Sequence, residues 1–537
     1  MIFKLIDILL FFSVYILSFS CIAGYGIILN KYIYKDNFHK NNFQLCFDGF
    51  LLLLILSFLI YLFLDTNKYF NVFLLIFGLI IFIKHQKFQN KIKQDFLFLS
   101  LFFVGLLISK SHDDFVLYHF LHLKELTEVK LQLGLANLSP RYAYSSIFTY
   151  IQIIFYVPYF GFKLFHLPSF LIFVSLLGHL YHLINDKKQH VNNKIFYSTL
   201  LLFCILKFTR LSEFGYDYVA QFILLYLFVQ IIDSNYFLFR EKLKLINYFI
   251  FAICVKITSI LFFPIIFLLY NKDIFKNLLS NLKKNFLVIS LLFFLIFTII
   301  GNSFIKTGCV FYPLNNTCLN KKIVSWSIDK NELKKVQNIV IYWAKSFAHQ
   351  SKDKSIEKEI YLKNFNWVDN WINQHFFYKI FEHLLIFIFY YLIILFLIGK
   401  NFTKYNFSTK KIVLFGLSSL SILLWFSLIP QLRFGSTVII IFIYSLLNLF
   451  SKNVQSISIK NFKIVFVITL LLFNIKNIDR INKELNRSDE NKYTNFPWFY
   501  EPTLIRKSDC LYSKYKCDNP KIKVRKTKHY NIISLKD

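Results

Sequence analysis

Long apolar blocks, separated by short polar gaps rich in lysine, run along most of this chain. A helix needs about 20 residues to cross a bilayer, and it satisfies its own backbone hydrogen bonds there. The pattern predicts an all-α polytopic membrane protein, with a bundle of about 12–14 transmembrane helices over residues 1–475 and a polar tail over 476–537. The apolar blocks fall near residues 5–29, 47–64, 69–84, 96–110, 144–165, 168–184, 195–209, 218–233, 244–270, 285–301, 377–399, 411–429, 434–450 and 461–475.

The lysines predict which side of the membrane each gap occupies, because cytoplasmic loops carry an excess of Lys and Arg. By that rule the loops 111–143 and 302–376 and the short segment 430–433 lie outside, and we expect the tail outside as well. The basic gaps that we assign to the cytoplasm are 31–46, 84–94, 187–194, 272–284, 400–411 and 452–463.

Two apolar blocks do not fit a simple crossing. Block 144–165 contains Gln152 and Pro158, which favour a re-entrant or interfacial segment over a spanning helix. Block 244–270 is long and has Lys256 near its middle, so we expect two helices that turn at this lysine.

The composition excludes an ordinary soluble protein. Hydrophobic residues make up 56% of the chain and charged residues 17%, whereas soluble domains have roughly 45–50% and about 25%. Lys and Arg number 62 against 30 Asp and Glu, which gives a net charge of +32. Because most of these cations fall between apolar blocks, we attribute them to membrane orientation and expect no nucleic-acid partner.

Candidate catalytic acids lie at the start of the 111–143 loop and of a later block. Asp113 and Asp114 directly follow an apolar block, and Asp217 opens block 218–233. A carboxylate at such a boundary can accept a proton from a substrate hydroxyl as a general base. The alternative is that these acids only complement the dipole of a helix that begins there.

Candidate substrate-binding residues are mostly cationic, namely Arg141, Lys256 and Arg433, with His119 beside the acidic pair. Arginine binds phosphate with a two-pronged geometry, and a lysine within an apolar block usually faces a cavity or a partner. Long cationic side chains that reach for the membrane interface are the alternative. His119 and His122 lack a third ligand, so no metal site and no cofactor are indicated.

Acids and cations on one membrane face would suit a sugar carried on a lipid phosphate, since acids act on a hydroxyl and cations stabilise a departing phosphate. Tryptophans of the 302–376 loop could stack on sugar rings or anchor the loop at the interface. They are Trp326, Trp343, Trp367 and Trp371.

Several motifs resemble those of known families. The segments Gly134–Ser146 (GLANLSPRYAYSS), Gly308–Cys318 (GCVFYPLNNTC), Pro430–Gly435 (PQLRFG) and Cys510–Cys517 (CLYSKYKC) resemble a poorly characterised bacterial family of polysaccharide-locus membrane proteins. The order of an acidic first loop, a later acid, a lysine and an arginine-containing late helix is similar to that of GT-C-type integral membrane glycosyltransferases. The chain departs from that pattern in having three apolar blocks before the acidic loop instead of one helix.

The GT-C resemblance implies a GT-C-like bundle in the bacterial inner membrane, with its active site on the periplasmic side. It implies a polyprenyl-phosphate-linked sugar as donor and a glycan or lipid as acceptor, bound beside membrane lipid. In it, Asp113 or Asp114 would be the base or the acid that orients the acceptor. Asp217 would support the site, and Arg433 would bind phosphate.

Two close cysteine pairs lie in segments that we place outside, Cys309 with Cys318 and Cys510 with Cys517. An oxidising outer compartment would favour a local disulfide in each pair. If the topology is the reverse, these cysteines are reduced instead.

The sequence is also compatible with two other functions. One is a polymerase or ligase of surface polysaccharide with another fold, which would rely on outer-loop arginines. The other is a lipid-carrier flippase or transporter, which would need charges at mid-membrane depth and repeated halves. Only Lys256 favours the transporter.

Overall fold

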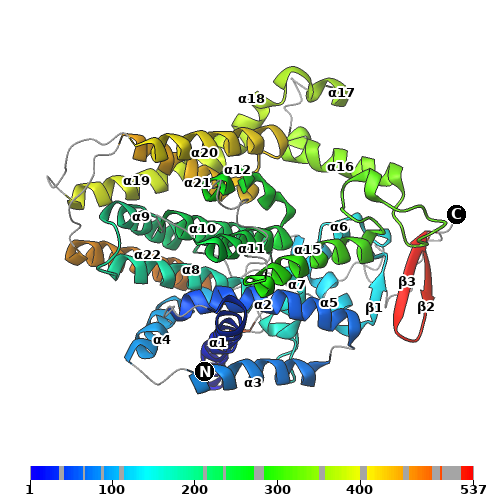
Figure 1. The fold of residues 1–537 in the computed structure, drawn as a ribbon, viewed down its shortest axis with the longest axis horizontal. Coiled ribbons are helices and arrows are strands. Elements are labelled where there is room, and N and C mark those ends of the chain that lie inside the picture. The colour runs from blue at the N-terminus through cyan, green and yellow to red at the C-terminus, as the bar shows by residue number, and fades with distance from the viewer. Residues whose placement is uncertain are drawn as a thin grey trace.

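The computed structural model describes residues 2–35, 41–64, 67–85, 90–107, 114–209, 215–233, 238–270, 283–349, 357–398, 408–450, 459–486, 496–498 and 522–535. Most of these residues are helical, as the apolar pattern predicted (Figure 1). The helices are α1 (Ile2–Ile28), α2 (Asn42–Phe63), α3 (Lys68–His85), α4 (Asn90–Phe102), α5 (Phe120–Glu128), α6 (Pro140–Ala143), α7 (Phe148–Ile154), α8 (Leu167–Asn185), α9 (Val191–Lys207), α10 (Asp217–Asp233), α11 (Phe239–Val255), α12 (Phe263–Ile266), α15 (Phe286–Thr307), α16 (Lys330–Ala344), α17 (Lys358–Tyr361), α18 (Val368–Trp371), α19 (Phe381–Ile398), α20 (Thr409–Leu428), α21 (Leu432–Leu449) and α22 (Ile459–Leu485).

Eight helical segments in the described part of the chain are long and apolar enough to cross a membrane, so this is a multi-pass membrane protein. They contain α1, α2, α3, α8, α15, α19, α20 and α21. Fewer segments meet both conditions than the 12–14 that we expected. Most of the other apolar blocks form shorter helices, although α22 has 27 residues. The helices α9, α10 and α11 have 17 residues each, and α4 has 13.

The two irregular blocks behave as their polar residues predicted. Within block 144–165, α7 has only 7 residues, too few to cross a bilayer. Within block 244–270, α11 ends at Val255, and Lys256 has an extended backbone with φ −151 and ψ 121. A 3-10 turn and the short α12 follow, which confirms the break at the lysine.

A small sheet was not predicted from the sequence. Strand β1 (Leu131–Leu133) belongs to the 111–143 loop, whereas β2 (Ile522–Lys526) and β3 (Tyr530–Leu535) belong to the tail. Their order is β1-β3-β2, with β1 parallel and β2 antiparallel to β3. Figure 1 shows the sheet at one end of the bundle, so the tail folds back onto the first loop.

The loops and tail that were assigned to one membrane face meet at this same end. The Gly134 amide donates to Ile305 O at 2.7 Å, and Asn137 Nδ2 donates to Trp326 O at 2.9 Å and Ile533 O at 3.0 Å. Gly134 has a φ of 83, a left-handed conformation that glycine adopts without strain. The boundary that we placed at residue 475 falls inside α22, which continues to Leu485.

Candidate functional site

Four charged side chains from distant parts of the chain meet at one place, which we name the four-charge site: Asp114, Asp217, Lys256 and Arg433. Lys256 Nζ lies 2.7 Å from Asp217 Oδ1. Arg433 Nη1 lies 3.4 Å from Asp217 Oδ2 and 3.8 Å from Asp114 Oδ2. Their side chains are between 17% and 33% exposed, so the site is partly shielded but open to a ligand.

Helix ends position the first ion pair. Asp217 is the first residue of α10, where a carboxylate is favoured by the positive end of the helix dipole. Lys256 directly follows α11, where a cation is favoured by the negative end. The Lys256 ammonium also lies 5.1 Å from the ring centres of Tyr216 and Phe434.

Hydrogen bonds hold the Pro430–Gly435 turn that carries Arg433. Trp371 Nε1 donates to Pro430 O at 2.6 Å, and Trp425 Nε1 donates to Gln431 O at 3.0 Å. The Gln431 side chain donates to Ala344 O at 2.7 Å. The backbone that presents the guanidinium is therefore fixed from three other parts of the fold.

Gly435 is required for the same turn. A Cβ built on Gly435 would lie 2.2 Å from Trp425 Nε1, which is closer than any side chain tolerates. The small residue lets the indole reach the Gln431 carbonyl. The motif PQLRFG is thus explained by packing around Arg433.

Arg433 is stacked on the 302–376 loop. Its guanidinium carbon lies 4.5 Å from the ring centre of Trp343, near the end of α16. Cations over an indole face are attracted by about 0.5–2 kcal/mol. The buried Arg433 Nε has no hydrogen-bond acceptor among the described residues. The guanidinium can therefore donate a further hydrogen bond to a ligand.

Aromatic contacts connect Arg141 and His119 to this site. The Arg141 guanidinium lies 5.3 Å from the ring centre of Tyr118, and the Tyr118 and His119 rings are 4.2 Å apart. His119 meets Tyr216 edge to face at 5.1 Å. Burial raises the pKa of Tyr118, and the carboxylates of Asp114 and Asp217 raise it further, so its hydroxyl stays protonated.

The structure thus brings together six of the sequence-predicted site residues: Asp114, His119, Arg141, Asp217, Lys256 and Arg433. Asp113, Cys510 and Cys517 lie outside the described residues. Cys309 and Cys318 form a disulfide beside the meeting point of the loops.

His122 is buried and contacts another buried side chain. It lies in α5, and its Nε2 is 3.3 Å from the buried Lys306 Nζ, which also contacts Ser145 Oγ at 2.6 Å. Burial lowers the pKa of His122 well below its ordinary value, and Lys306 lowers it further. The part of the chain that the structure describes contains no group of three or more His, Cys, Asp or Glu that could hold a metal.

Sequence reasoning missed the residues that hold the site in place. Gln221 and Gln431 are glutamines at or near the ends of apolar blocks, a weak signal that a buried polar contact is needed. Trp343 and Trp371 were noted as sugar-stacking or interface residues. In the structure, Trp343 packs on Arg433, and Trp371 hydrogen-bonds the turn.

The fold and this site define a helical multi-pass membrane protein with a partly shielded cluster of acids and cations at its helix ends. The chain belongs to the family described as a domain of unknown function, DUF8201, whose model matches residues 8–440. That range includes all four residues of the four-charge site and excludes β2 and β3. No curated protein and no solved structure matches the chain significantly.

Proposed function

We propose that this protein is a membrane glycosyltransferase. It would transfer a sugar from a polyprenyl-phosphate carrier to a glycan or lipid acceptor at the outer face of the bacterial inner membrane. The observation that carries the proposal is the meeting of Asp114, Asp217, Lys256 and Arg433 within ion-pair distance. These side chains supply both kinds of group that the transfer needs.

Asp114 is the proposed base. An acceptor hydroxyl attacks the anomeric carbon of the donor sugar, and its proton passes to the Asp114 carboxylate. The bond between the anomeric carbon and the phosphate oxygen breaks, and the lipid phosphate leaves with the electron pair. General base catalysis of this kind contributes about 10²–10⁴-fold.

Arg433 and Lys256 are the proposed phosphate ligands. Asp217 lies between them and holds both cations close together. Two cations fixed in this way can stabilise the charge that develops on the departing phosphate. Trp343 restricts the guanidinium from the other side, which reduces the reorganisation that the reaction requires.

The placement of the charges favours transfer over transport. Asp217 starts α10, Lys256 follows the end of α11, and Arg433 is the second residue of α21. We place Asp114, Asp217 and Arg433 at the outer face, whereas a carrier needs charges along a path through the bilayer. A polysaccharide polymerase or ligase would share the outer arginine, but it gives no role to the Asp114 carboxylate.

A labelling experiment tests this proposal. Cells that depend on this chain for surface polysaccharide are fed tritiated monosaccharide, and lipid-linked and polymer-linked label are separated. Arg433→Lys keeps the charge and loses the two-pronged geometry, so we expect polymer label to fall at least tenfold. We also expect lipid-linked sugar to accumulate on the outer face of the membrane, where externally added periodate can oxidise it.

The matched control is Arg240→Lys, near the other end of α11, which should leave polymer label unchanged. Accumulation that periodate cannot reach would indicate a flippase and overturn the proposal. Unchanged polymer label in Arg433→Lys would overturn it as well.

A further inference from the structure

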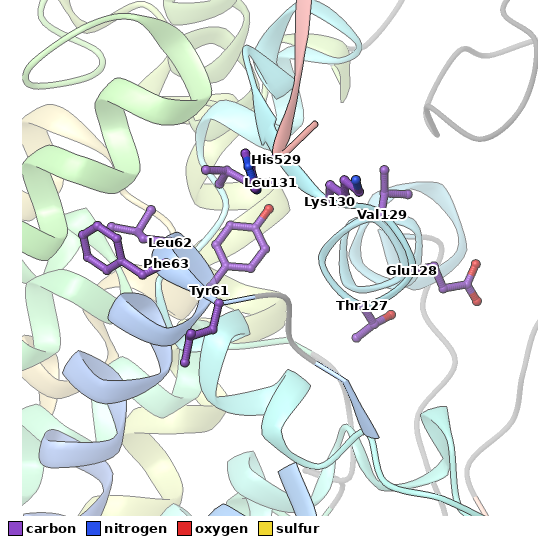
Figure 2. Close-up of a pocket in the computed structure, with 10 residues that line it drawn as sticks. Tyr61, Leu62, Phe63, Thr127, Glu128, Val129, Lys130, Leu131 and His529 are labelled. Atoms are coloured by element: carbon purple, nitrogen blue, oxygen red, sulfur yellow. The ribbon is translucent and has the colours of Figure 1, made fainter. Parts of the chain in front are cut away.

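A second polar site lies away from the four-charge site. A cavity of about 240 Å³ is lined by the end of α2 at Tyr61–Leu64, by Thr127–Leu131 and by His529 (Figure 2). None of these residues belongs to the four-charge site. The π-helical turn and α5 run from Phe115 to Glu128 between the two. At about 1.5 Å per residue, that separation is roughly 20 Å.

The cavity contains an unused hydrogen-bond donor. Tyr61 is 5% exposed, and its hydroxyl has no hydrogen-bond acceptor among the described residues. Figure 2 shows this hydroxyl pointing toward the space between Leu131 and Lys130. The backbone amide of Gln132 can donate to the same oxygen, which leaves the hydroxyl hydrogen of Tyr61 to be donated to a ligand. A ligand oxygen placed there would satisfy a group whose desolvation costs about 1–3 kcal/mol.

One lysine lines the cavity, and further cations lie on the adjoining tail hairpin. The Lys130 ammonium donates to the carbonyl of Lys528, which holds it beside the tail hairpin. In Figure 2 the Glu128 carboxylate points away from the other lining side chains. The hairpin of β2 and β3 has no acidic residue between Ile522 and Leu535, and it carries Lys523, Arg525, Lys526 and Lys528. The local field therefore favours an anion.

The remaining wall of the cavity is apolar and faces outward. Phe63 is 77% exposed and Leu64 is 51% exposed, and both lie where α2 ends. Because α2 is one of the membrane-spanning helices, these side chains lie where the helix leaves the hydrocarbon layer. A ligand that fits both walls has an anionic head and an apolar chain.

We propose that this cavity binds the phosphate headgroup of an anionic membrane lipid. Tyr61 and Lys130 hydrogen-bond the phosphate oxygens, and the hydrocarbon chains lie along Phe63 and Leu64. Binding here ties the tail hairpin to the membrane surface. No bond is made or broken at this site, so the proposal stands or falls independently of sugar transfer.

Lipid binding to the full-length protein in neutral detergent tests the proposal. The probes are short-chain phosphatidylglycerol, zwitterionic short-chain phosphatidylcholine and inorganic phosphate, and the readout is native mass spectrometry. We expect phosphatidylglycerol to bind at least tenfold more tightly than phosphatidylcholine. The double variant Tyr61→Phe with Lys130→Gln should lose at least tenfold in affinity for phosphatidylglycerol.

The control is Lys334→Gln, an exposed lysine on α16, which removes the same charge and should leave the affinity unchanged. Tyr61→Phe alone keeps the ring packing, so a loss of affinity in that variant with an unchanged melting temperature supports the site. Equal affinity of wild type and the double variant overturns the proposal. Displacement of the lipid by an equal concentration of inorganic phosphate overturns the assignment to a lipid.

Discussion

Gln221 on α10 and Thr437 on α21 are joined by two hydrogen bonds. The Thr437 amide donates to Gln221 Oε1 at 2.9 Å, and Thr437 Oγ1 donates to Gln221 O at 2.9 Å. Gln221 lies one helical turn after Asp217, and Thr437 lies one turn after Arg433. The glutamine therefore fixes the relative position of the Asp217 carboxylate and the Arg433 guanidinium.

Replacing this glutamine tests that positioning role. Gln221→Met keeps the length of the side chain and removes its buried hydrogen bonds with the Thr437 amide and the Phe434 carbonyl. Each lost hydrogen bond costs about 0.5–1.5 kcal/mol, so we expect a lower melting temperature and at least tenfold less sugar transfer. Gln230→Met on the same helix removes a bond to His179 and should lower the melting temperature alone. Equal transfer in the two variants would argue against a positioning role.

Two glycines offer a matched comparison of packing. Gly435→Ala places a methyl group against the Trp425 indole, so we expect destabilisation and loss of transfer. Gly416, inside α20, has nothing within 4 Å of a built Cβ. Gly416→Ala should therefore raise stability by up to about 1 kcal/mol through helix propensity. Thermal unfolding in detergent measures both, and a stable Gly435→Ala protein would contradict the packing account.

The disulfide between Cys309 and Cys318 gives a test of topology. In a variant with Cys510 and Cys517 replaced by serine, a membrane-impermeant maleimide should label intact spheroplasts only after impermeant reductant is added. The remaining four cysteines lie within helices of the membrane bundle, away from the aqueous loops that the impermeant maleimide reaches, which keeps the background low. Labelling that requires lysis of the spheroplasts would place the loop in the cytoplasm and overturn the outer assignment.

His122 predicts a pH dependence of stability. Its pKa is lowered in the fold, whereas an unfolded histidine titrates near pH 6.5. Below that pH the unfolded state binds a proton that the folded state does not, so stability is lost as the pH falls. One such group contributes up to about 1.4 kcal/mol per pH unit. We expect His122→Gln to reduce the slope of the melting temperature between pH 6.5 and 5, and an unchanged slope would exclude this role.

Hydropathy and single polar residues predicted much of this fold. The long blocks predicted helices, and Lys256 predicted the break after α11, since a lysine inside an apolar run needs a partner or a turn. The sheet could not be predicted, because β1 has only three residues and pairs with a strand about 400 positions later in the chain. Only tertiary contact makes such short strands stable.

The charged members of the site were predicted, but the residues that hold them were not. Asp217, Lys256 and Arg433 stand out because charge at the edge of an apolar block is costly and needs a reason. Gln221, Gln431 and Trp425 do not stand out. Their role depends on which backbone carbonyl or amide they reach, and sequence spacing says nothing about that.

The most direct measurement is sugar transfer by Asp114→Asn in the same labelled cells, with membrane protein levels matched. Asparagine keeps the shape of the side chain and cannot accept the proton of the acceptor hydroxyl, so polymer-linked label should fall at least about 100-fold. The control Asp479→Asn alters an exposed pair with Lys483 on α22 and should transfer normally. Normal transfer by Asp114→Asn would contradict the account.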